Sequence, residues 1–430
     1  MAHEQGPVGE EAESGQAGAK TPGGQLAGET LEHRASVSSP VGAVKVGRVR
    51  RVRRRWSRIP LPMGQPMGVA LVGFGNVGRR LARHLRGAYA RALRDHGTRV
   101  RVTGIATARH GMAIDPGGVD LGRALRLVER GRSLDPLHRG PRVAGVADFI
   151  DRVSADVLVE ITTLDPRSGR PAVDHVRQAL RRGMHVVTAN KGPVAFALRS
   201  LKALAAREGR LFLHEGAVMD GTPVFNLAER CLRGTRVVSF RGTLNSTTNL
   251  VLSRMEEGLS AKAAVREAQA LGIAEADPAN DLEGWDAAVK GCAIANGIMG
   301  ASVRPSQVRR QGIAGLSTRD ARAALRAGTR LRLVVRGERR RGRVRVSVAP
   351  ERIPFGDPLS GSGPDAALVL ETDLMGEIGV FERGATVDQT AYAILSDLLE
   401  VARADAARLS SSGSAASTDG GASRGRRPRG

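Results

Sequence analysis

The chain has 430 residues, enough for two or three domains, and 41% of them are hydrophobic, so a sizeable buried core is expected. No apolar run reaches the roughly 18 residues that a membrane-spanning helix requires. No apolar stretch of the signal-peptide type follows the N-terminal charges. These features predict a cytoplasmic protein without a membrane segment.

The net charge of +23 raises the question of nucleic-acid binding. Only six of the 66 basic residues are lysines, and the arginines are spread along the whole chain. Aromatic residues make up 3% of the chain, which leaves few side chains for stacking on bases. We therefore expect no nucleic-acid partner, and any binding of polyanions is expected from the basic terminal segments alone.

The two cysteines, Cys231 and Cys292, are too few for a disulfide framework and lack metal-ligand spacing. Both are expected to be small core residues of a reduced protein. Neither stands beside a matching base motif, which argues against a dehydrogenase that uses a thiol nucleophile.

In chain order, residues 1–66 form an extension rich in small and acidic residues that ends in arginines, and we predict that it is disordered. A buried strand then starts at Val69 and runs into Gly73-Phe74-Gly75-Asn76-Val77-Gly78. Apolar residues at steps of three and four from Val77 to Ala88 predict a helix after this turn.

Short β-rich runs alternate with helical stretches up to residue 215. Strands are predicted over 99–106, 156–162, 184–188 and 210–214, and helices over 173–182 and 198–208. This alternation is typical of an α/β fold, and we predict a Rossmann-type doubly wound parallel sheet over 67–215.

The pattern changes over 216–380, where we predict an inserted α+β catalytic and dimerisation domain. Its expected elements are helices over 224–232, 247–257 and 261–271 and a hairpin of strands over 331–336 and 343–349. Residues 381–409 should form a C-terminal helix, centred on 390–403, that returns to the nucleotide-binding domain. Residues 410–430 should be a disordered tail.

The glycine-rich turn after the first strand predicts a dinucleotide site. Gly73 permits the tight turn, Gly75 lets the backbone approach a pyrophosphate, and Gly78 lets the helix pack closely on the strand. The second strand ends near Arg109 with no carboxylate, which favours NADP and leaves NAD possible. Arg109 could equally be one more surface arginine.

A second unusual segment contains three ionisable residues. Asp286 and Lys290 are four residues apart and would lie on one face of a helix, while Glu275 lies on the preceding loop, which Pro278 keeps non-helical. Together they could bind a small zwitterion, with the carboxylates on its ammonium group and the lysine facing its oxygen. The alternative is an ordinary exposed ion pair.

Several stretches together resemble the homoserine dehydrogenase family from about residue 69 to 403. They are, in order, GFGNVG (73–78), TANK (188–191), EGAVMDGTPV (215–224), GTLNSTTN (242–249), the block from Leu271 to Lys290, and the turn and helix from Arg383. The block 271–290 is the most specific of these. The resemblance implies interconversion of aspartate 4-semialdehyde and homoserine, a nicotinamide cofactor and a homodimer.

The resemblance also assigns roles to individual positions. Lys290 and Lys191 are the implied catalytic residues. The implied substrate-binding residues are Glu275, Asp286, Asn245 and Thr247. The implied cofactor contacts, besides 73–78 and Arg109, are Thr162, Thr163, Lys191 and Gly384. A sodium site, made largely of main-chain carbonyls, is implied at Glu215, Val218, Asp220 and Thr222.

Two stretches depart from the family pattern. Asp220 stands where the family usually has a small residue, so the ion site could be strengthened or disrupted. Thr386, Asp388 and Gln389 replace the expected glycine and proline pattern of the closing turn. Neither an aspartate kinase segment before the core nor a regulatory amino-acid-binding domain after it is expected, so we expect a monofunctional form.

In the reducing direction Lys290 would supply a proton to the aldehyde oxygen. In oxidation it would have to accept one, so we expect burial or the neighbouring Lys191 to lower the pKa of Lys290. Two other functions remain open from the sequence: a related oxidoreductase acting on another small amino-acid aldehyde or alcohol, and a non-enzymatic cofactor-binding sensor.

Overall fold

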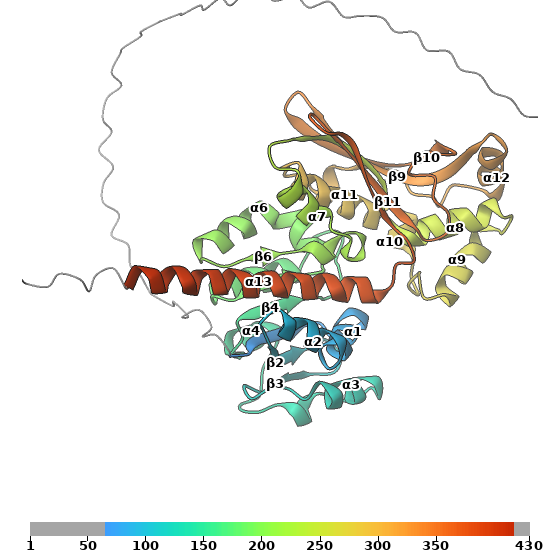
Figure 1. Ribbon diagram of the computed structural model, residues 1–430. Coiled ribbons are helices and arrows are strands. Elements are labelled where there is room, and N and C mark those ends of the chain that lie inside the picture. The colour runs from blue at the N-terminus through green and yellow to red at the C-terminus, as the bar shows by residue number, and fades with distance from the viewer. Residues whose placement is uncertain (1–64, 417–430) are drawn as a thin grey trace, which may run out of the picture. The chain divides into compact units, whose positions relative to one another are not determined.

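The computed structural model describes residues 65–416, and the predictions for 1–64 and 417–430 lie outside these residues. The described part contains two six-stranded sheets within one compact unit (Figure 1). Within this part, no helix is both long enough and apolar enough to cross a membrane.

The first sheet has the strand order β3-β2-β1-β4-β5-β6. Its strands are β1 (Met67–Val72), β2 (Val100–Ala106), β3 (Met112–Ile114), β4 (Val157–Glu160), β5 (His185–Thr188) and β6 (Phe212–Leu213). All neighbouring strands are parallel except β3, which runs antiparallel to β2. The predicted doubly wound sheet is confirmed, with β1 and β4 flanking the point where the strand order reverses.

Helices cover both faces of this sheet because successive residues of its buried strands point to opposite sides. They are α1 (Asn76–Leu85), α2 (Ala88–Asp95), α3 (Leu121–Glu129), α4 (Val146–Arg152), α5 (Ala172–Arg181), α6 (Lys191–Arg207) and α13 (Val387–Ala416). Ala70 and Val72 of β1 pack with residues of α4, α5 and α6. Val69 and Leu71 pack with residues of α1, α3 and α13. The last helix of the chain therefore shares a core with the first strand.

The second sheet has the order β12-β11-β7-β9-β10-β8. Its strands are β7 (Val237–Thr243), β8 (Arg309–Arg310), β9 (Thr329–Arg340), β10 (Arg343–Pro354), β11 (Ala366–Thr372) and β12 (Gly376–Glu382). The predicted hairpin is β9–β10, with strands longer than expected. Its two-residue turn has left-handed φ angles at Arg341 and Gly342, 49° and 78°, which suits the twist of a tight hairpin.

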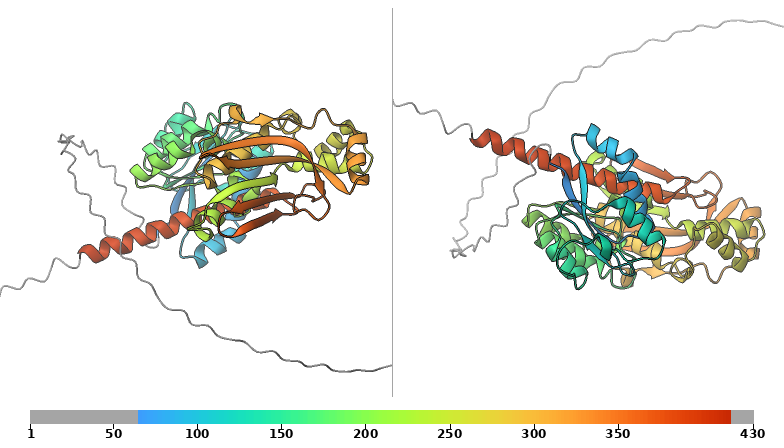
Figure 2. Two further views of the ribbon diagram at one scale, coloured as in Figure 1. Left: turned by 90° about the horizontal axis from the view of Figure 1, so that it is seen from above. Right: turned by 90° about the horizontal axis from the view of Figure 1, so that it is seen from below.

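Helices α8 (Ser246–Glu256), α11 (Trp285–Ile298) and α12 (Thr318–Arg326) pack on the second sheet through β9 and β10 (Figure 2). Helix α9 (Ala261–Ala270) packs on α8, and α10 (Ala279–Leu282) packs on α8 and α11. The shorter segments of the chain are η1 (Asp135–Leu137), η2 (Glu215–Ala217), η3 (Met219–Gly221), α7 (Val224–Asn226), η4 (Leu227–Cys231) and η5 (Pro305–Gln307). Helix α11 approaches the sheet closely, since a Cβ at Gly291 would lie 2.5 Å from Cγ1 of Val335.

Three expectations differ from the structure. The segment 224–232 is not one regular helix but the short α7 followed by the π-helical η4. Helix α13 continues to Ala416, so the predicted loose tail is wrong for 410–416. Cys292 is buried as expected, but Cys231 is exposed at the end of η4. The π-helical widening interrupts the face that a regular helix over 224–232 would have buried.

Candidate active site

The carboxyl ends of β1, β4 and β5 meet at one edge of the first sheet. The Gly73–Gly78 turn follows β1, Ile161 to Thr163 follow β4, and Lys191 follows β5 as the first residue of α6. These strands are neighbours in the order β1-β4-β5, so the three segments lie side by side. Crevices at this edge are where open α/β sheets bind ligands.

The glycine turn has the two properties needed to receive a pyrophosphate. Gly73 has φ +107°, and a Cβ there would lie 2.4 Å from the carbonyl oxygen of Ile161, so only glycine fits the close approach of the two turns. A Cβ at Gly75 would meet nothing within 4 Å, so the space in front of Gly75 is open. The first turn of α1 carries no acidic residue, which leaves its amide groups free of a competing charge.

Three ionised side chains meet beside this edge. Asp286 receives Lys191 Nζ at 3.1 Å on one carboxylate oxygen and Lys290 Nζ at 3.0 Å on the other. The side chains of Asp286 and Lys290 are only 13% and 15% exposed. The arrangement is therefore a largely buried two-lysine clamp on one carboxylate, not an ordinary exposed pair at helical spacing.

Asn245 sets the orientation of this cluster. Its Oδ1 accepts the backbone N–H of Thr248 at 2.8 Å and so caps α8. The amide is thereby oriented so that Nδ2 donates to Asp281 Oδ1 at 2.8 Å and to Asp286 Oδ2 at 2.9 Å. Lys290 Nζ also donates to the carbonyl of Leu244 at 2.6 Å, which fixes the lysine against the end of β7.

The electrostatics of the cluster follow from its charges. Burial favours neutral Asp286, but Lys191 and Lys290 outweigh it and hold the pKa of Asp286 below its usual value. Burial together with the neighbouring Asp286 raises the pKa of Asp281. Burial by itself would lower the pKa of Lys290, but Asp286, Asp220 and Asp281 raise it to about 12. The expected lowering of the Lys290 pKa is therefore wrong, because the surrounding carboxylates outweigh desolvation.

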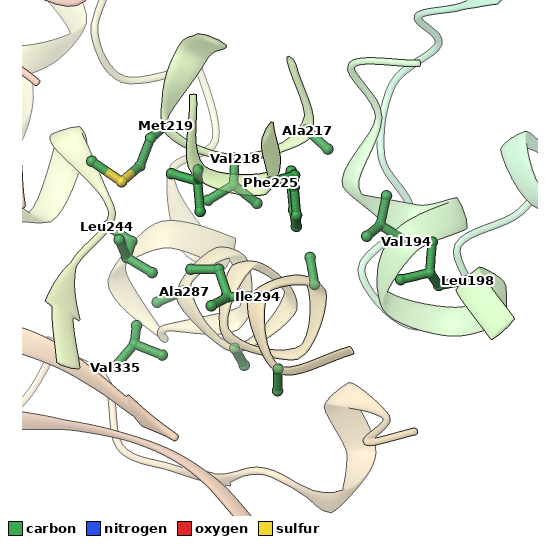
Figure 3. Packing of buried hydrophobic residues seen from close by; sticks show 14 of the residues in the cluster. Val194, Leu198, Ala217, Val218, Met219, Phe225, Leu244, Ala287, Ile294 and Val335 are labelled. Carbon is green, nitrogen blue, oxygen red and sulfur yellow. The ribbon is translucent and has the colours of Figure 1, made fainter. Parts of the chain in front are cut away.

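Helix α11 holds Asp286 and Lys290 in a rigid setting. Figure 3 shows Ala287 and Ile294 of α11 packed among Leu244, Val335 and residues of α6. One buried cluster includes these residues and strands of both sheets. Asp286 and Lys290 are therefore carried by a helix that is packed into the core through its neighbouring residues.

Glu275 is placed differently from the other predicted substrate residues. Its side chain is exposed, and its carbonyl accepts the side chain of Gln269 at 3.2 Å. Thr247 is buried and donates to the carbonyl of Ile273 at 3.2 Å, beside Asn245. Besides Asp286, the acidic residue that contacts Asn245 is Asp281, a second carboxylate that lies six positions after Glu275.

The predicted cofactor residues lie around the sheet edge. Phe74 is buried in the core, so only its main chain faces the turn. Thr162 accepts Asn190 Nδ2 at its carbonyl oxygen, and Thr163 is exposed. Arg109 is exposed on the loop after β2, and this loop adjoins the glycine turn because Gly73 N–H donates to the carbonyl of Ala106 at 2.9 Å.

The closing loop between β12 and α13 contains Gly384, whose φ is +61°. In place of the expected glycine and proline pattern, Asp388 pairs with His84 and, at 3.4 Å, with Arg80, both on α1. The departure therefore ties the start of α13 to the helix that begins at the glycine turn.

The loop predicted to hold sodium has an unusual backbone. Met219 and Asp220 both have left-handed φ angles, 51° and 43°. The carboxylate of Glu215 is engaged by the backbone N–H groups of Phe225 and Asn226, at 2.9 and 2.8 Å, and Thr222 O accepts Val224 N–H at 2.7 Å. In the part of the chain that the structure describes, no group of three or more His, Cys, Asp or Glu could hold a metal ion. The Glu215 carboxylate and the Thr222 carbonyl oxygen are therefore already hydrogen-bonded within the protein.

Two acidic residues near the cluster were not predicted as site residues. Asp281 lies within the block 271–290 but was given no role there, and only its contact with Asn245 indicates one. Glu382 is 6% exposed, and burial, with Asp220 nearby, raises its pKa to about 7. No local pattern marks Glu382, because its surroundings come from distant segments.

A cavity of about 760 Å³ lies elsewhere, at the β9–β10 hairpin. Its lining includes Arg336, Arg339 and Arg340 of β9 and Arg343 and Arg345 of β10. None of the predicted site residues lines it, and it holds no lysine–carboxylate cluster. Cys292 is no nucleophile either, since burial raises the pKa of its thiol to about 12.

Comparison with protein families adds an independent result. The family model described as homoserine dehydrogenase matches residues 223–399, and the model described as its NAD-binding domain matches residues 73–215. The chain is similar to a homoserine dehydrogenase of Methanocaldococcus jannaschii, 37% identical over 338 residues that span 78% of this chain and 98% of that relative. An NAD(+)-dependent homoserine dehydrogenase of Pseudomonas canavaninivorans is 37% identical over 335 residues, which span 77% and 95% of the two chains.

Solved structures agree. A homoserine dehydrogenase from Thiobacillus denitrificans has a TM-score of 0.67 and 30% identity, and the match covers 80% of this chain and 74% of that one. One from Thermoplasma acidophilum has a TM-score of 0.67 and 27% identity, covering 79% and 100%.

Proposed function

Because the chain belongs to the homoserine dehydrogenase family, we propose that the cluster of Lys191, Asp286 and Lys290 is where it interconverts aspartate 4-semialdehyde and homoserine. The observation that carries this proposal is the clamp of two lysines on the one carboxylate of Asp286, beside the carboxyl ends of β4 and β5. The enzyme is an oxidoreductase with a nicotinamide-binding domain.

Lys290 is the proton donor of the reducing direction. Its ammonium has three hydrogens, and Leu244 O and Asp286 account for two of its contacts. The third hydrogen is then available to the substrate oxygen, where negative charge develops during reduction. The bound nicotinamide supplies the hydride chemistry. Since its pKa is raised to about 12, Lys290 stays charged at neutral pH and suits proton donation.

Acidic side chains recognise the substrate's ammonium group. Asp286 already forms ion pairs with two lysines. Asp281 accepts a hydrogen bond from Asn245 Nδ2 at 2.8 Å, and among the described contacts no lysine lies within ion-pair distance of it. We propose Asp281 as an additional ammonium contact and retain Glu275, whose exposed loop position would let it close over a bound substrate. Asn245 and Thr247 position the carboxylates from the start of α8.

The decisive assay is homoserine oxidation by the full chain with NADP and with NAD, followed at 340 nm. Hydroxy acids of similar length that lack the α-amino group are the matched control, because the carboxylate contacts require an ammonium. Turnover of the control alcohols at the same rate, or no turnover of homoserine, would contradict the assignment of this cluster.

For the cofactor we propose NADP in preference to NAD, with Arg109 as the partner of the 2′-phosphate. We expect Arg109→Ala to weaken NADP binding about 10- to 100-fold, the size of one lost charged hydrogen bond, and to leave NAD binding nearly unchanged. Fluorescence titration of both cofactors measures this, with Arg91→Ala on exposed α2 as the control. An equal loss of affinity for NADP and NAD would show that Arg109 does not bind the 2′-phosphate.

The glycine turn allows a matched pair of substitutions. Gly75→Val should leave the melting temperature close to that of the wild type, because the new side chain enters open space, yet it should block the pyrophosphate and abolish the stabilisation that NADP gives. Gly73→Ala should instead destabilise the fold by about 1–3 kcal/mol, since its φ is left-handed and its Cβ would collide with Ile161 O. Thermal unfolding with and without NADP tests both, and retained NADP stabilisation in Gly75→Val would contradict the placement of the pyrophosphate.

We also propose a cytoplasmic homodimer that uses the second sheet, with a monovalent ion held by the loop from Glu215 to Thr222. Three large apolar side chains near the edge strand β12 support the dimer, namely Leu374, Met375 and Phe381, which are 73%, 64% and 53% exposed. Light scattering after size-exclusion chromatography gives the oligomeric state, and activity in sodium against potassium or choline salts tests the ion.

A further inference from the structure

Glu160, the last residue of β4, has an unexpected environment. Its carboxyl side chain is completely buried within the parallel sheet, one strand from both β1 and β5. Burial of a carboxylate is costly unless it is hydrogen-bonded or paired with a cation. A residue of this type at the ligand-binding edge of the sheet therefore suggests a role beyond packing.

The carboxylate is held from three elements. The backbone N–H of Thr162 donates to Oε1 at 3.3 Å, and the Thr162 hydroxyl donates to the same oxygen over a short contact. Thr188 Oγ1, at the end of β5, lies 3.4 Å from Oε2 and 2.8 Å from the carbonyl oxygen of Glu160. Nδ1 of His175 on α5 lies 3.5 Å from Oε1.

These contacts determine whether the Thr162 hydroxyl acts as a hydrogen-bond donor or acceptor toward other groups. A hydroxyl has one hydrogen, and Glu160 takes it, so the lone pairs of Thr162 Oγ1 face other partners. Asn190 Nδ2 lies 3.4 Å from that oxygen and 3.0 Å from the Thr162 carbonyl. Thr162 is thus presented to a ligand as a hydrogen-bond acceptor, suited to an amide or hydroxyl group of the nicotinamide end of the cofactor.

The same network reaches Lys191. Asn190 N–H donates to Thr188 Oγ1 at 3.0 Å, and Asn190 Oδ1 accepts Gly192 N–H at 2.8 Å as the cap of α6. Lys191 lies between these two anchored residues as the first residue of the helix. The position of its backbone is therefore tied to Glu160 through Thr188, and to Thr162 through Asn190.

We propose that Glu160 is a positioning residue that fixes Thr162 as an acceptor for the nicotinamide end of the cofactor and aligns the start of α6 that carries Lys191. This rests on the proposed function for the location of the nicotinamide. Glu160 itself touches neither cofactor nor substrate. Glu160 acts on cofactor binding only through Thr162 and Asn190. Its substitution should therefore affect binding of the nicotinamide end and not of the adenosine end.

That confinement provides the test. In the full chain, Glu160→Gln should raise the Kd of NADP about tenfold, equivalent to about 1.4 kcal/mol, and slow single-turnover hydride transfer. It should leave the Kd of 2′,5′-ADP, which lacks the nicotinamide half, unchanged; ADP replaces this probe if NAD is preferred. Asp174→Asn, on the exposed face of α5, is the matched carboxylate-to-amide control. Equal weakening of NADP and 2′,5′-ADP, or no weakening of either, would overturn the proposal.

Variants at Thr162 separate positioning from folding. Thr162→Val in a chain that keeps Glu160 should reproduce the selective loss of NADP binding, and Thr162→Ser should restore it. In the Thr162→Val background, Glu160→Gln should add little, whereas independent roles would give multiplied losses. The binding measurements need no substrate, so failure of homoserine turnover would contradict the proposed function and leave this test intact. If Glu160→Gln does not fold, the Thr162 variants alone decide, and normal NADP binding by Thr162→Val would refute the proposal.

Discussion

Replacing Lys290 by alanine is expected to lower kcat about 10²- to 10⁴-fold in both directions, the usual contribution of a positioned proton donor or acceptor. The Kd of NADP should stay near the wild-type value, because Lys290 lies on α11 and contacts Leu244 O and Asp286, not the glycine turn. Steady-state rates and fluorescence titration on the same preparation separate the two effects.

The fold should survive this substitution. Asp286 keeps Lys191 at 3.1 Å, so its carboxylate is not left without a cation. Lys262→Ala, on exposed α9, is the control for loss of a lysine elsewhere. Lys290→Arg should also be strongly impaired, because a longer, planar guanidinium does not fit the place of the ammonium between Asp286 and Leu244 O. Normal turnover by either variant would remove Lys290 from the mechanism.

Asp286→Asn should have the second largest effect, and it should reduce both activity and stability. The substitution leaves the ammonium groups of Lys191 and Lys290 close together without their shared counter-charge. Breaking a buried ion pair in this way costs about 3 kcal/mol. Chemical denaturation gives that loss, and Glu283→Gln, an exposed neighbour, is the control.

The pH dependence of this stability loss has a defined sign. Asp286 has a lowered pKa, so its contribution is present above its usual value of 3.8 and disappears as pH falls through the folded-state pKa. Lys290 has a raised pKa, so its contribution is present below 10.5 and disappears as pH rises through about 12. The difference in the free energy of unfolding between wild type and Asp286→Asn should therefore be greatest from about pH 4 to 10. It should become smaller in acid.

The same substitution should change the pH–rate profile of aldehyde reduction. Of the carboxylates that raise the pKa of Lys290, Asp286 has the largest effect. Without it, the alkaline limb that reports deprotonation of Lys290 should move to lower pH. An unchanged limb would show that another group donates the proton.

The local sequence pattern was sufficient to predict most strands and helices of the first domain. The run from Val69 to Val72 has the composition of a strand buried on both faces, and the glycines after it leave few alternatives for the turn. The second sheet was harder to predict. Strand β11 reads as a continuous apolar run that could be a strand or a buried helix, and β12 is an edge strand with mostly exposed residues. Its pairing with β11, not its own pattern, makes it a strand.

By itself, the sequence determined the family, the nucleotide-binding sheet and the pairing of Asp286 with Lys290, because these depend on local periodicity and on motifs of neighbouring residues. Only the tertiary structure decided that Lys191 joins the same carboxylate, that Asp281 and not Glu275 meets Asn245, and that the pKa of Lys290 is raised. These features depend on through-space distances between segments far apart in the chain. Coulomb energies and desolvation vary steeply with such distances, and local sequence patterns do not encode them.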